Sequence, residues 1–319
     1  MNATRRATIF TPLAILGCLF ALTLVHRPTV AGQAGVSFWA LVAVFWIAAG
    51  MALSGLSHLR PKDATVRRLT WLAVPVLFGA FLFFLWEVVV VGAGVPSVLM
   101  PAPSAIASRF ASSLPVLRDD FIQTFLKSVL SGYAMGCLSG FLGAILADRI
   151  PFLRRGLLPL GNFVSALPVI GIAPIMVMWF GFDWPSKAAV VVVMTFFPML
   201  VNTVAGLSAA GRLERDLMHS YAAGYWTDLV KLRLPVALPF IFNALKINST
   251  LALIGAIVAE FFGTPIVGMG FRISIEVARM SLDMVWAEIA LAAIAGSAFY
   301  GLVALIERSV TFWHPSYRA

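Results

Sequence analysis

GRLERDLMHSYAAGYWTDLVKLRLPVALP, residues 211–239, is a polar segment that lies between two long apolar runs of the chain. Its hydrophobic spacing predicts a helix in which Leu213, Leu217 and Tyr221 share one face, because residues four apart are neighbours on a helix. Gly224 follows and permits a sharp turn, since glycine adopts backbone angles that other residues avoid.

The second half of this segment predicts another short helix, with Trp226, Leu229 and Val230 along one side. Pro235 fits the first turn of a further helix, where its missing N–H group does no harm. We therefore expect two amphipathic helices held against a membrane between two spans. The apolar face of the first helix is expected to pack on the chain's own spans.

Composition supports a membrane location. Hydrophobic residues make up 61% of the 319 residues and charged residues 12%, where soluble domains carry about 25% charge. The mean hydropathy is +0.94. The formal net charge of +9 does not indicate nucleic-acid binding, because the basic residues are spread between the apolar runs. Cys18 and Cys137 both lie in apolar runs and predict neither a disulfide framework nor a zinc site.

The chain contains apolar runs that approach or exceed the length of about 20 residues needed for one crossing. They lie at 9–25, 36–56, 69–91, 125–147, 157–180, 188–207, 236–259 and 285–306. The sequence therefore predicts an all-α polytopic membrane protein with about eight spans. The first run is either a signal-anchor helix or a cleaved signal peptide. We favour the anchor, because Thr29-Val30-Ala31 is a poor cleavage site.

Two of these runs have special residues. Gly132, Gly136 and Gly140 form one stripe of the run at 125–147, a spacing that lets another helix backbone approach closely. The run at 157–180 contains several prolines, and we expect Pro168 and Pro174 to interrupt its hydrogen-bond ladder. Lipid cannot satisfy the freed backbone groups, so this run should be surrounded by protein or line a cavity.

The distribution of lysine and arginine predicts the orientation. One set of loops, with both termini and residues 208–235, carries 15 basic residues, and the opposite set carries 7. The positive-inside rule places the first set in the cytoplasm. We therefore expect both termini and the 211–235 loop on the cytoplasmic side.

The 211–235 loop resembles the cytoplasmic loop of ATP-binding cassette (ABC) importer permeases. That motif reads E-A-A, three residues, G, nine residues, an aliphatic residue, one residue, L-P. With residues 234–235 on L-P, Asp216 falls on Glu, Leu217 on the first Ala and Ala222 on Gly. Trp226 falls where nitrate, sulfonate and taurine permeases often carry Trp. The resemblance implies an ATPase-coupling set: Asp216, Leu217, Ala222, Gly224, Trp226, Leu234 and Pro235.

Flanking stretches resemble the same family in the same order. They are LWEVVVVGAGVPSVLMPAPSAI from Leu85, SALPVIGIAPIMVMWFGF from Ser165, TFFPMLVNTVAGL from Thr195 and LALIGAIVAEFFG from Leu251. The resemblance covers residues 69–312. It implies a six-helix type I importer permease domain there, with coupling loop 211–235, an additional pair of spans at 1–68 before it, and a cytoplasmic tail at 313–319.

The resemblance implies the permease subunit of an importer in the bacterial inner membrane. A periplasmic solute-binding protein would deliver the solute, and two copies, as a homodimer, would form the pathway. The chain has no G-x-x-x-x-G-K-[ST] motif, so ATP and Mg would bind a separate ATPase. We expect no cofactor, no metal site and no enzyme activity in this chain.

The implied solute is nitrate, a sulfonate, taurine or a pyrimidine-type vitamin precursor. The alternative is a secondary transporter driven by an ion gradient, for which inverted repeats and paired broken helices would be expected. Only the 157–180 run is strongly interrupted, which favours the importer.

Candidate pathway residues are polar groups or prolines within or beside spans. They are Pro168, Pro174, Asn202, Asn243, Lys246 and Glu260. Lys246 is a basic residue deep in a span, and intramembrane charges often mark function. It either anchors its helix or contacts the solute. Glu260, at the outer end of its span, either caps the pathway or is solvated.

Overall fold

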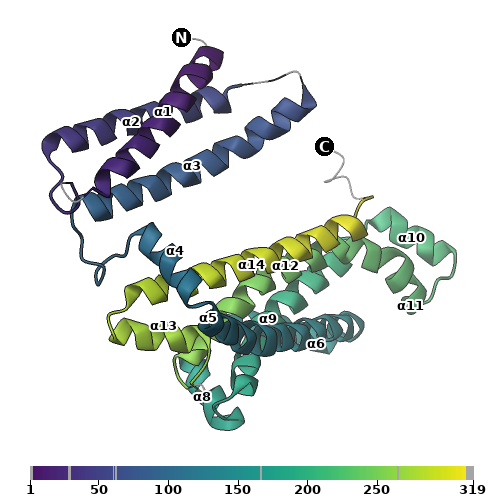
Figure 1. Ribbon diagram of the computed structural model, residues 1–319. Coiled ribbons are helices and arrows are strands. Elements are labelled where there is room, and N and C mark those ends of the chain that lie inside the picture. The colour runs from purple at the N-terminus through teal and green to yellow at the C-terminus, as the bar shows by residue number, and fades with distance from the viewer. Residues whose placement is uncertain are drawn as a thin grey trace. The chain divides into compact units, whose positions relative to one another are not determined.

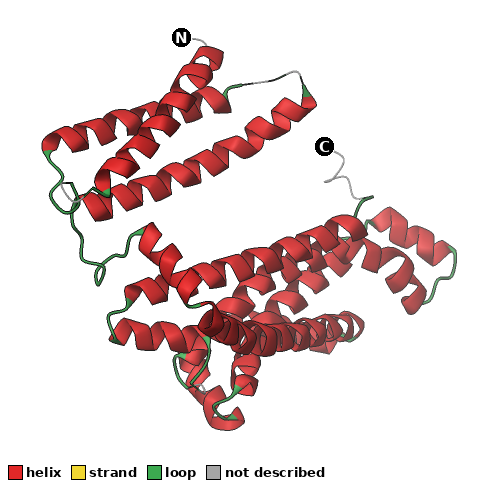
Figure 2. Cartoon of the chain, in the orientation of Figure 1, coloured by secondary structure: helices red, strands yellow, loops and turns green. Residues whose placement is uncertain are grey.

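The computed structural model describes residues 3–27, 30–59, 61, 63–165, 167–263 and 266–313. These residues form helices and connecting loops, with no strand among them (Figures 1 and 2). Of the predicted tail at 313–319, all but Trp313 lies outside the described residues, as do Arg60 and Lys62. The helices group into two compact units, residues 1–112 with 280–286 and residues 113–279 with 287–319.

The first unit contains four helices, α1 (Ala3–Val25), α2 (Val36–Ser57), α3 (Ala64–Gly92) and α4 (Pro103–Ser112). α1 and α2 pack along each other, with small residues such as Ala14 and Ala49 in the contact core. Glu87 of α3 is 5% exposed. Its carboxylate accepts hydrogen bonds from the Ser104 backbone N–H at 2.9 Å and hydroxyl at 2.6 Å, which fixes the start of α4. The sequence groups α3 with the permease domain, whereas α3 packs here with α1 and α2.

The second unit contains the remaining elements. They are α5 (Leu114–Phe121), the π-helix η1 (Ile122–Val129), α6 (Leu130–Arg149), α7 (Pro151–Ser165), α8 (Val169–Phe180), α9 (Trp184–Ser208), α10 (Arg212–Ser220), α11 (Tyr225–Asp228), the π-helix η2 (Leu229–Arg233), α12 (Leu234–Glu260), α13 (Met269–Ala278) and α14 (Leu282–Val310). The first residues of α14 group with the first unit. α9 is the central helix, because both α6 and α12 pack along it.

The glycine stripe of α6 lies against α9. A Cβ atom added to Gly136 would lie 2.0 Å from the Thr195 hydroxyl oxygen, and one added to Gly140 would lie 2.4 Å from the Phe196 carbonyl oxygen. Real Cβ atoms cannot approach so closely. The prediction that this stripe admits another helix backbone is confirmed.

Six helical segments are long and apolar enough to cross a membrane. They are Val36–Ser57, Ala64–Gly92, Leu114–Arg149, Trp184–Ser208, Tyr225–Glu260 and Leu282–Val310. The expected number of eight is not reached among the described residues. The first run is a shorter apolar stretch, Ile9–Val25, within α1.

The run at 157–180 is divided between α7 and α8. Pro168 caps the start of α8 with extended backbone angles, φ −67° and ψ 123°. The 12 residues of α8 extend about 18 Å at 1.5 Å per residue, less than the hydrocarbon core of about 30 Å. Proline therefore ends one helix and begins another here, while Pro174 lies inside α8.

Candidate functional site

The turn of the 211–235 loop is built around Ala222. The Ala223 N–H donates to the Met218 carbonyl at 3.0 Å and the Ala222 N–H to that of His219 at 2.9 Å, the bonding pattern of a Schellman motif. This motif places one residue in the left-handed region, and Ala222 has φ +53°. Gly224, expected to make the turn, instead has φ −71° and caps α11. Ala222, which has this left-handed conformation, is also the residue aligned with the glycine of the importer loop motif.

The second helix of the loop continues into the following span. α11, η2 and α12 form one helical segment of 36 residues, Tyr225–Glu260. This corrects the expectation of a separate short helix ending before Pro235. η2 directly precedes Pro235, and the Leu234 N–H bonds back five residues to the Leu229 carbonyl. The wider π turn accommodates the proline ring and its missing donor without ending the helix.

The apolar face of α10 is open. Leu213 is 84% exposed, Leu217 57% and Tyr221 77%, so the expectation that this face packs on the permease's own spans is wrong. Trp226 is also exposed, at 56%. Asp216 is exposed, and its carboxylate has no partner within the described part of the chain. The loop thus presents a surface that no described part of the protein covers.

Polar side chains hold the base of the loop. Arg233 donates to the Asp148 carboxylate through two nitrogens, one at 2.8 Å, and to the Leu207 carbonyl at 3.0 Å. The Tyr225 hydroxyl donates to the same carboxylate at 3.0 Å. The Asp148 side chain is 4% exposed and that of Arg233 11%. These contacts join α6, α9 and the loop. Sequence reasoning missed them, because 85 positions separate the two charges.

Aromatic residues of the loop are oriented by a neighbouring cation. The Arg149 guanidinium lies 5.6 Å from the centre of the Tyr225 ring and 5.4 Å from that of Trp226. The two rings meet edge to face at 5.3 Å. Leu229, one turn later, is 1% exposed and packs in the core. Leu234 and Pro235 are half-buried beyond it. Trp226 is therefore exposed and lies against both the Arg149 guanidinium and the Tyr225 ring.

The opposite end of the 36-residue helix holds a buried polar cluster, which we call the α13 cap. Glu260, 2% exposed, accepts from the Gly270 N–H and from the Thr124 hydroxyl, both at 2.7 Å. Thr124 in turn accepts from the Met269 N–H at 2.8 Å. Asp120 accepts from the Gly268 N–H at 2.6 Å. Side chains of three elements thus satisfy the free N–H groups that begin α13.

This geometry contradicts one of the two expectations for Glu260. Its carboxylate is buried and bonded, so it is not solvated. Asp120 also pairs with Arg272 at 2.8 Å. The sequence showed neither Asp120 nor Thr124 as a site residue, because their partners are backbone N–H groups more than a hundred positions away.

Lys246 forms an ion pair with Glu307 of α14, with 2.7 Å between Nζ and Oε2. The two side chains are 19% and 7% exposed. This contact favours the anchoring role for Lys246. Asn202 donates to the Pro198 carbonyl of its own helix at 2.8 Å, and Asn243 is exposed. The structure therefore does not bring the candidate pathway residues together into one site.

Two further charged side chains are buried. Lys187 is 1% exposed, and its ammonium group donates to the Phe182 carbonyl at 2.5 Å and to that of Gly263. Glu288 is fully buried, and neither carboxylate oxygen has a hydrogen-bond partner in the described structure. Outside the spans, hydrogen bonds from the Trp184 N–H and the Gln123 side chain lower the pKa of Asp183.

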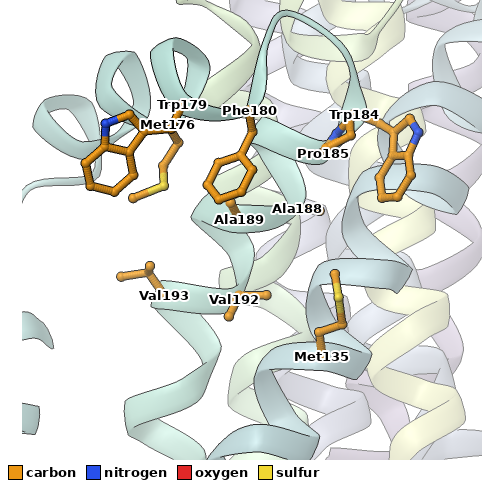
Figure 3. A pocket seen from close by; sticks show the side chains of 10 residues that line it. All are labelled: Met135, Met176, Trp179, Phe180, Trp184, Pro185, Ala188, Ala189, Val192 and Val193. Carbon is orange, nitrogen blue, oxygen red and sulfur yellow. The ribbon is translucent and has the colours of Figure 1, made fainter.

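α8 and the start of α9 border an apolar cavity of about 460 Å³ (Figure 3). Its walls include Trp179, Phe180 and Trp184, together with Met135 and Met176. The proline-rich run was expected to be surrounded by protein or to line a cavity. It is not surrounded within one chain, since Trp179 is 68% exposed, but α8 does line this cavity.

Comparison with known proteins agrees with this architecture. Residues 139–312 match the family described as binding-protein-dependent transport system inner membrane component. The riboflavin transport system permease RibX of Chloroflexus aurantiacus is 29% identical over 265 residues, which cover 82% of this chain and 98% of that protein. The formylaminopyrimidine transport permease ThiX of Halalkalibacterium halodurans is 30% identical over 75% of this chain and 95% of its own length.

The putative aliphatic sulfonates transport permease SsuC of Bacillus subtilis is 27% identical over 76% of this chain and 88% of its own length. The family match extends over the 211–235 loop, the 36-residue helix and all of α14. The chain therefore belongs to the inner-membrane components of binding-protein-dependent transport systems, the non-catalytic permease subunits of ABC transporters whose ATPase is a separate polypeptide.

Proposed function

We propose that the 211–235 loop docks a separate ATPase and transmits its movement to the transport pathway. The observations that carry this proposal are the exposed apolar face of α10 and, in the same loop, the exposed indole of Trp226, which lies against Arg149. Large aromatic side chains are typical of the residues that dominate interface energies. The exposed Asp216 carboxylate would meet a basic group of the ATPase.

The 36-residue helix Tyr225–Glu260 supports a mechanical form of coupling. At 1.5 Å per residue it is about 54 Å long, and its two ends carry the docking loop and the α13 cap. ATPase closure would move the loop, and the helix would carry that movement to Glu260. Rigid-body motions of this kind are a known basis of switching between two states.

Partners follow from the same proposal. A periplasmic solute-binding protein delivers the solute, ATP and Mg bind the ATPase alone, and no nucleic acid takes part. Two copies of the chain pair along α8. The broken backbone and apolar side chains of α8 support this homodimer, because lipid cannot satisfy backbone groups freed by proline. Family membership leaves no support for the alternative, an ion-gradient-driven secondary transporter.

The proposed solute is a small heteroaromatic vitamin precursor rather than nitrate, a sulfonate or taurine. The cavity beside α8 supports this choice, because its walls are apolar and include three aromatic side chains, Trp179, Phe180 and Trp184. Flat rings stack well against indole and phenyl groups. Uptake assays with a labelled aminopyrimidine and with labelled taurine test the choice, and uptake of taurine alone would contradict it.

We further propose eight crossings, with both termini in the cytoplasm, and with residues 1–68 as an additional pair of spans before the permease domain at 69–312. The basic-residue count of 15 against 7 supports this orientation. A reporter active only in the cytoplasm should work after Ala319 and fail within residues 92–102. Activity in that loop would contradict the topology.

The central experiment compares Trp226→Ala with Trp71→Ala. Trp71 is 76% exposed in α3 and lies outside the loop, so it is a matched control for loss of an exposed indole. Truncation of an interface anchor costs about 2 kcal/mol or more, so Trp226→Ala should weaken ATPase binding about 30-fold. Membrane insertion should be unchanged. The measurement is co-purification of the ATPase with solute-stimulated ATP hydrolysis.

The proposal fails if Trp226→Ala retains the ATPase at normal stoichiometry and transports normally. A second variant, Leu217→Ser, checks the apolar face of α10 independently. Because Leu217 is 57% exposed, its loss should not affect folding. Equal losses from Trp226→Ala and Trp71→Ala would show that the effect is not specific to the loop.

A further inference from the structure

Two arginines converge beside the coupling loop. Arg154 of α7 donates to the Ser208 hydroxyl at 3.1 Å, and Arg215 of α10 donates to the Ser208 carbonyl at 2.9 Å. Neither guanidinium forms an ion pair with a carboxylate in the described part of the chain. The Nε atom of Arg215 is buried without a hydrogen-bond acceptor. The two guanidinium groups bond the same residue, Ser208, although like charges repel each other, and the buried Nε–H of Arg215 has no acceptor. Both features indicate that the site binds an anion.

The two arginines line a cavity of about 430 Å³. Its charged and titratable lining residues are Asp148, Arg154, Arg215, His219, Tyr225, Asp228 and Arg233. Arg233 pairs with Asp148 at 2.8 Å and lies 4.0 Å from Asp228, so both aspartates face that one guanidinium. With His219 neutral, three arginines and two aspartates leave a net charge of +1. One monovalent anion would neutralise the group.

An apolar surface adjoins this charged cavity. Arg154 also lines a second cavity of about 430 Å³, together with Arg155 and two prolines of α7. The same helix exposes Phe152 at 84% and Phe163 at 66%. Arg154 therefore lies between a polar cavity and the apolar side chains of a helix that is too short, at 15 residues, to span a bilayer.

We propose that Arg154 and Arg215 bind the phosphate of an anionic phospholipid, with its acyl chains along the exposed apolar residues of α7. Guanidinium groups bind phosphate oxygens through paired hydrogen bonds, and basic pockets between helices are known to hold lipid headgroups. A phosphodiester carries one negative charge, which matches the net charge of the cavity. Free phosphate shares the headgroup chemistry but has no use for the apolar surface. Because Ser208 ends α9 and Arg215 lies in α10, bound lipid would hold the loop against the bundle.

Native mass spectrometry of the full-length chain in detergent tests this proposal, with phosphatidylglycerol, phosphatidylcholine and inorganic phosphate added separately. The wild-type protein should retain phosphatidylglycerol over phosphatidylcholine by about 30-fold, given about 1 kcal/mol for each of the two arginines. The double variant Arg154→Gln/Arg215→Gln should lose this preference. The control Arg212→Gln/Lys231→Gln should keep it, because it removes the same charge from two exposed positions that do not line the cavity.

If the double variant elutes as an aggregate, the measurement is repeated with the single variants Arg154→Gln and Arg215→Gln. Each should lower the preference about fivefold. An unchanged preference in the monodisperse variants would overturn the proposal. So would binding of inorganic phosphate that displaces phosphatidylglycerol, because the site would then serve a free anion. Loss of the ATPase with retention of the lipid preference would also overturn it, and would assign the arginines to docking. That outcome is separate from the Trp226 experiment.

Discussion

The two ends of the Tyr225–Glu260 helix differ in whether the chain itself covers them. At the Glu260 end, carboxylate and hydroxyl groups are buried and bonded to the first N–H groups of α13. At the loop end, polar groups fix the base while Leu213 and Trp226 remain exposed. At the Glu260 end the polar groups are satisfied within the chain, whereas at the loop end the apolar side chains stay exposed. The difference predicts that substitutions at Glu260 affect folding, whereas substitutions of exposed loop residues affect association.

The first unit contains a similar arrangement, in which a buried glutamate caps the start of another helix. Glu87 caps α4 through Ser104 in the same way that Glu260 caps α13, and His26 lies 3.0 Å from its carboxylate. In both places a buried glutamate at the end of a long helix meets the start of a short amphipathic one. The charge is tolerated because helix N-termini offer free donors and a favourable dipole.

The largest expected loss of stability comes from a substitution at the Glu260 end of the helix. Glu260→Ala removes the acceptor for the Gly270 N–H and for the Thr124 hydroxyl, and leaves these donors buried. Since each unsatisfied buried group costs about 1–3 kcal/mol, the variant should lose about 4 kcal/mol. Thermal unfolding in detergent measures the loss, and Glu260→Gln, which keeps one acceptor, should recover part of it. A wild-type melting temperature for Glu260→Ala would show that the α13 cap does not stabilise the fold.

The ion pair between Lys246 and Glu307 comes next. Lys246→Met leaves the Glu307 carboxylate, which is 7% exposed, without its partner. Because the lysine is partly exposed, we expect a loss of about 2 kcal/mol rather than the larger cost of a fully buried pair. The double variant Lys246→Met/Glu307→Leu should restore most of the stability. If the double variant remains as unstable as Lys246→Met, the pair is not the reason for the loss.

Glu288 can be compared with the paired Glu307. It is a fully buried carboxyl group whose oxygens have no hydrogen-bond partner in the described structure. Glu288→Gln keeps its shape and replaces the carboxyl group by an amide that cannot ionise. The change should leave stability unchanged or raise it by about 1 kcal/mol, since a fully buried carboxyl group gains nothing from ionising without a partner. Glu307→Gln is the control, because it removes a charge that is paired and should destabilise. A clear fall in melting temperature for Glu288→Gln would mean that the carboxyl group has a stabilising partner.

The smallest expected change in stability concerns the 211–235 loop, at the exposed end of the helix. Ala222 has φ +53°, a conformation that costs alanine more than glycine. Ala222→Gly should therefore stabilise the loop by about 0.5–1 kcal/mol. Gly224→Ala is the matched control, because Gly224 has φ −71° and space around its Cα. Hydrogen exchange of the α10 amides measures the local effect. Equal protection in wild type and Ala222→Gly would contradict the assigned strain.

Residues near one another in the chain were predicted well. The spacing of Leu213, Leu217 and Tyr221 indicated α10, and the motif alignment placed its glycine on Ala222, where the backbone is left-handed. The glycine stripe of α6 was read correctly, because a spacing of four puts small residues on one helix face. Such features depend on local geometry.

Contacts between distant residues could not be predicted. Nothing in the order of residues pairs Asp148 with Arg233, Lys246 with Glu307 or Asp120 with Gly268. The apolar face of α10 was predicted correctly as a face but placed against the wrong surface, because periodicity shows that a face exists and not what covers it.

The sequence by itself determined that this chain is an all-helical membrane protein with a polar loop at residues 211–235, since composition and period depend only on neighbouring residues. That it is a permease came from the resemblance of this loop and its flanking stretches to a known family. Only the tertiary structure decided that the loop continues into a 36-residue helix, that Pro168 divides α7 from α8, and that Glu260 is buried. The physical reason is that burial and charge pairing arise from several helices packing together, and each helix carries only part of the contact.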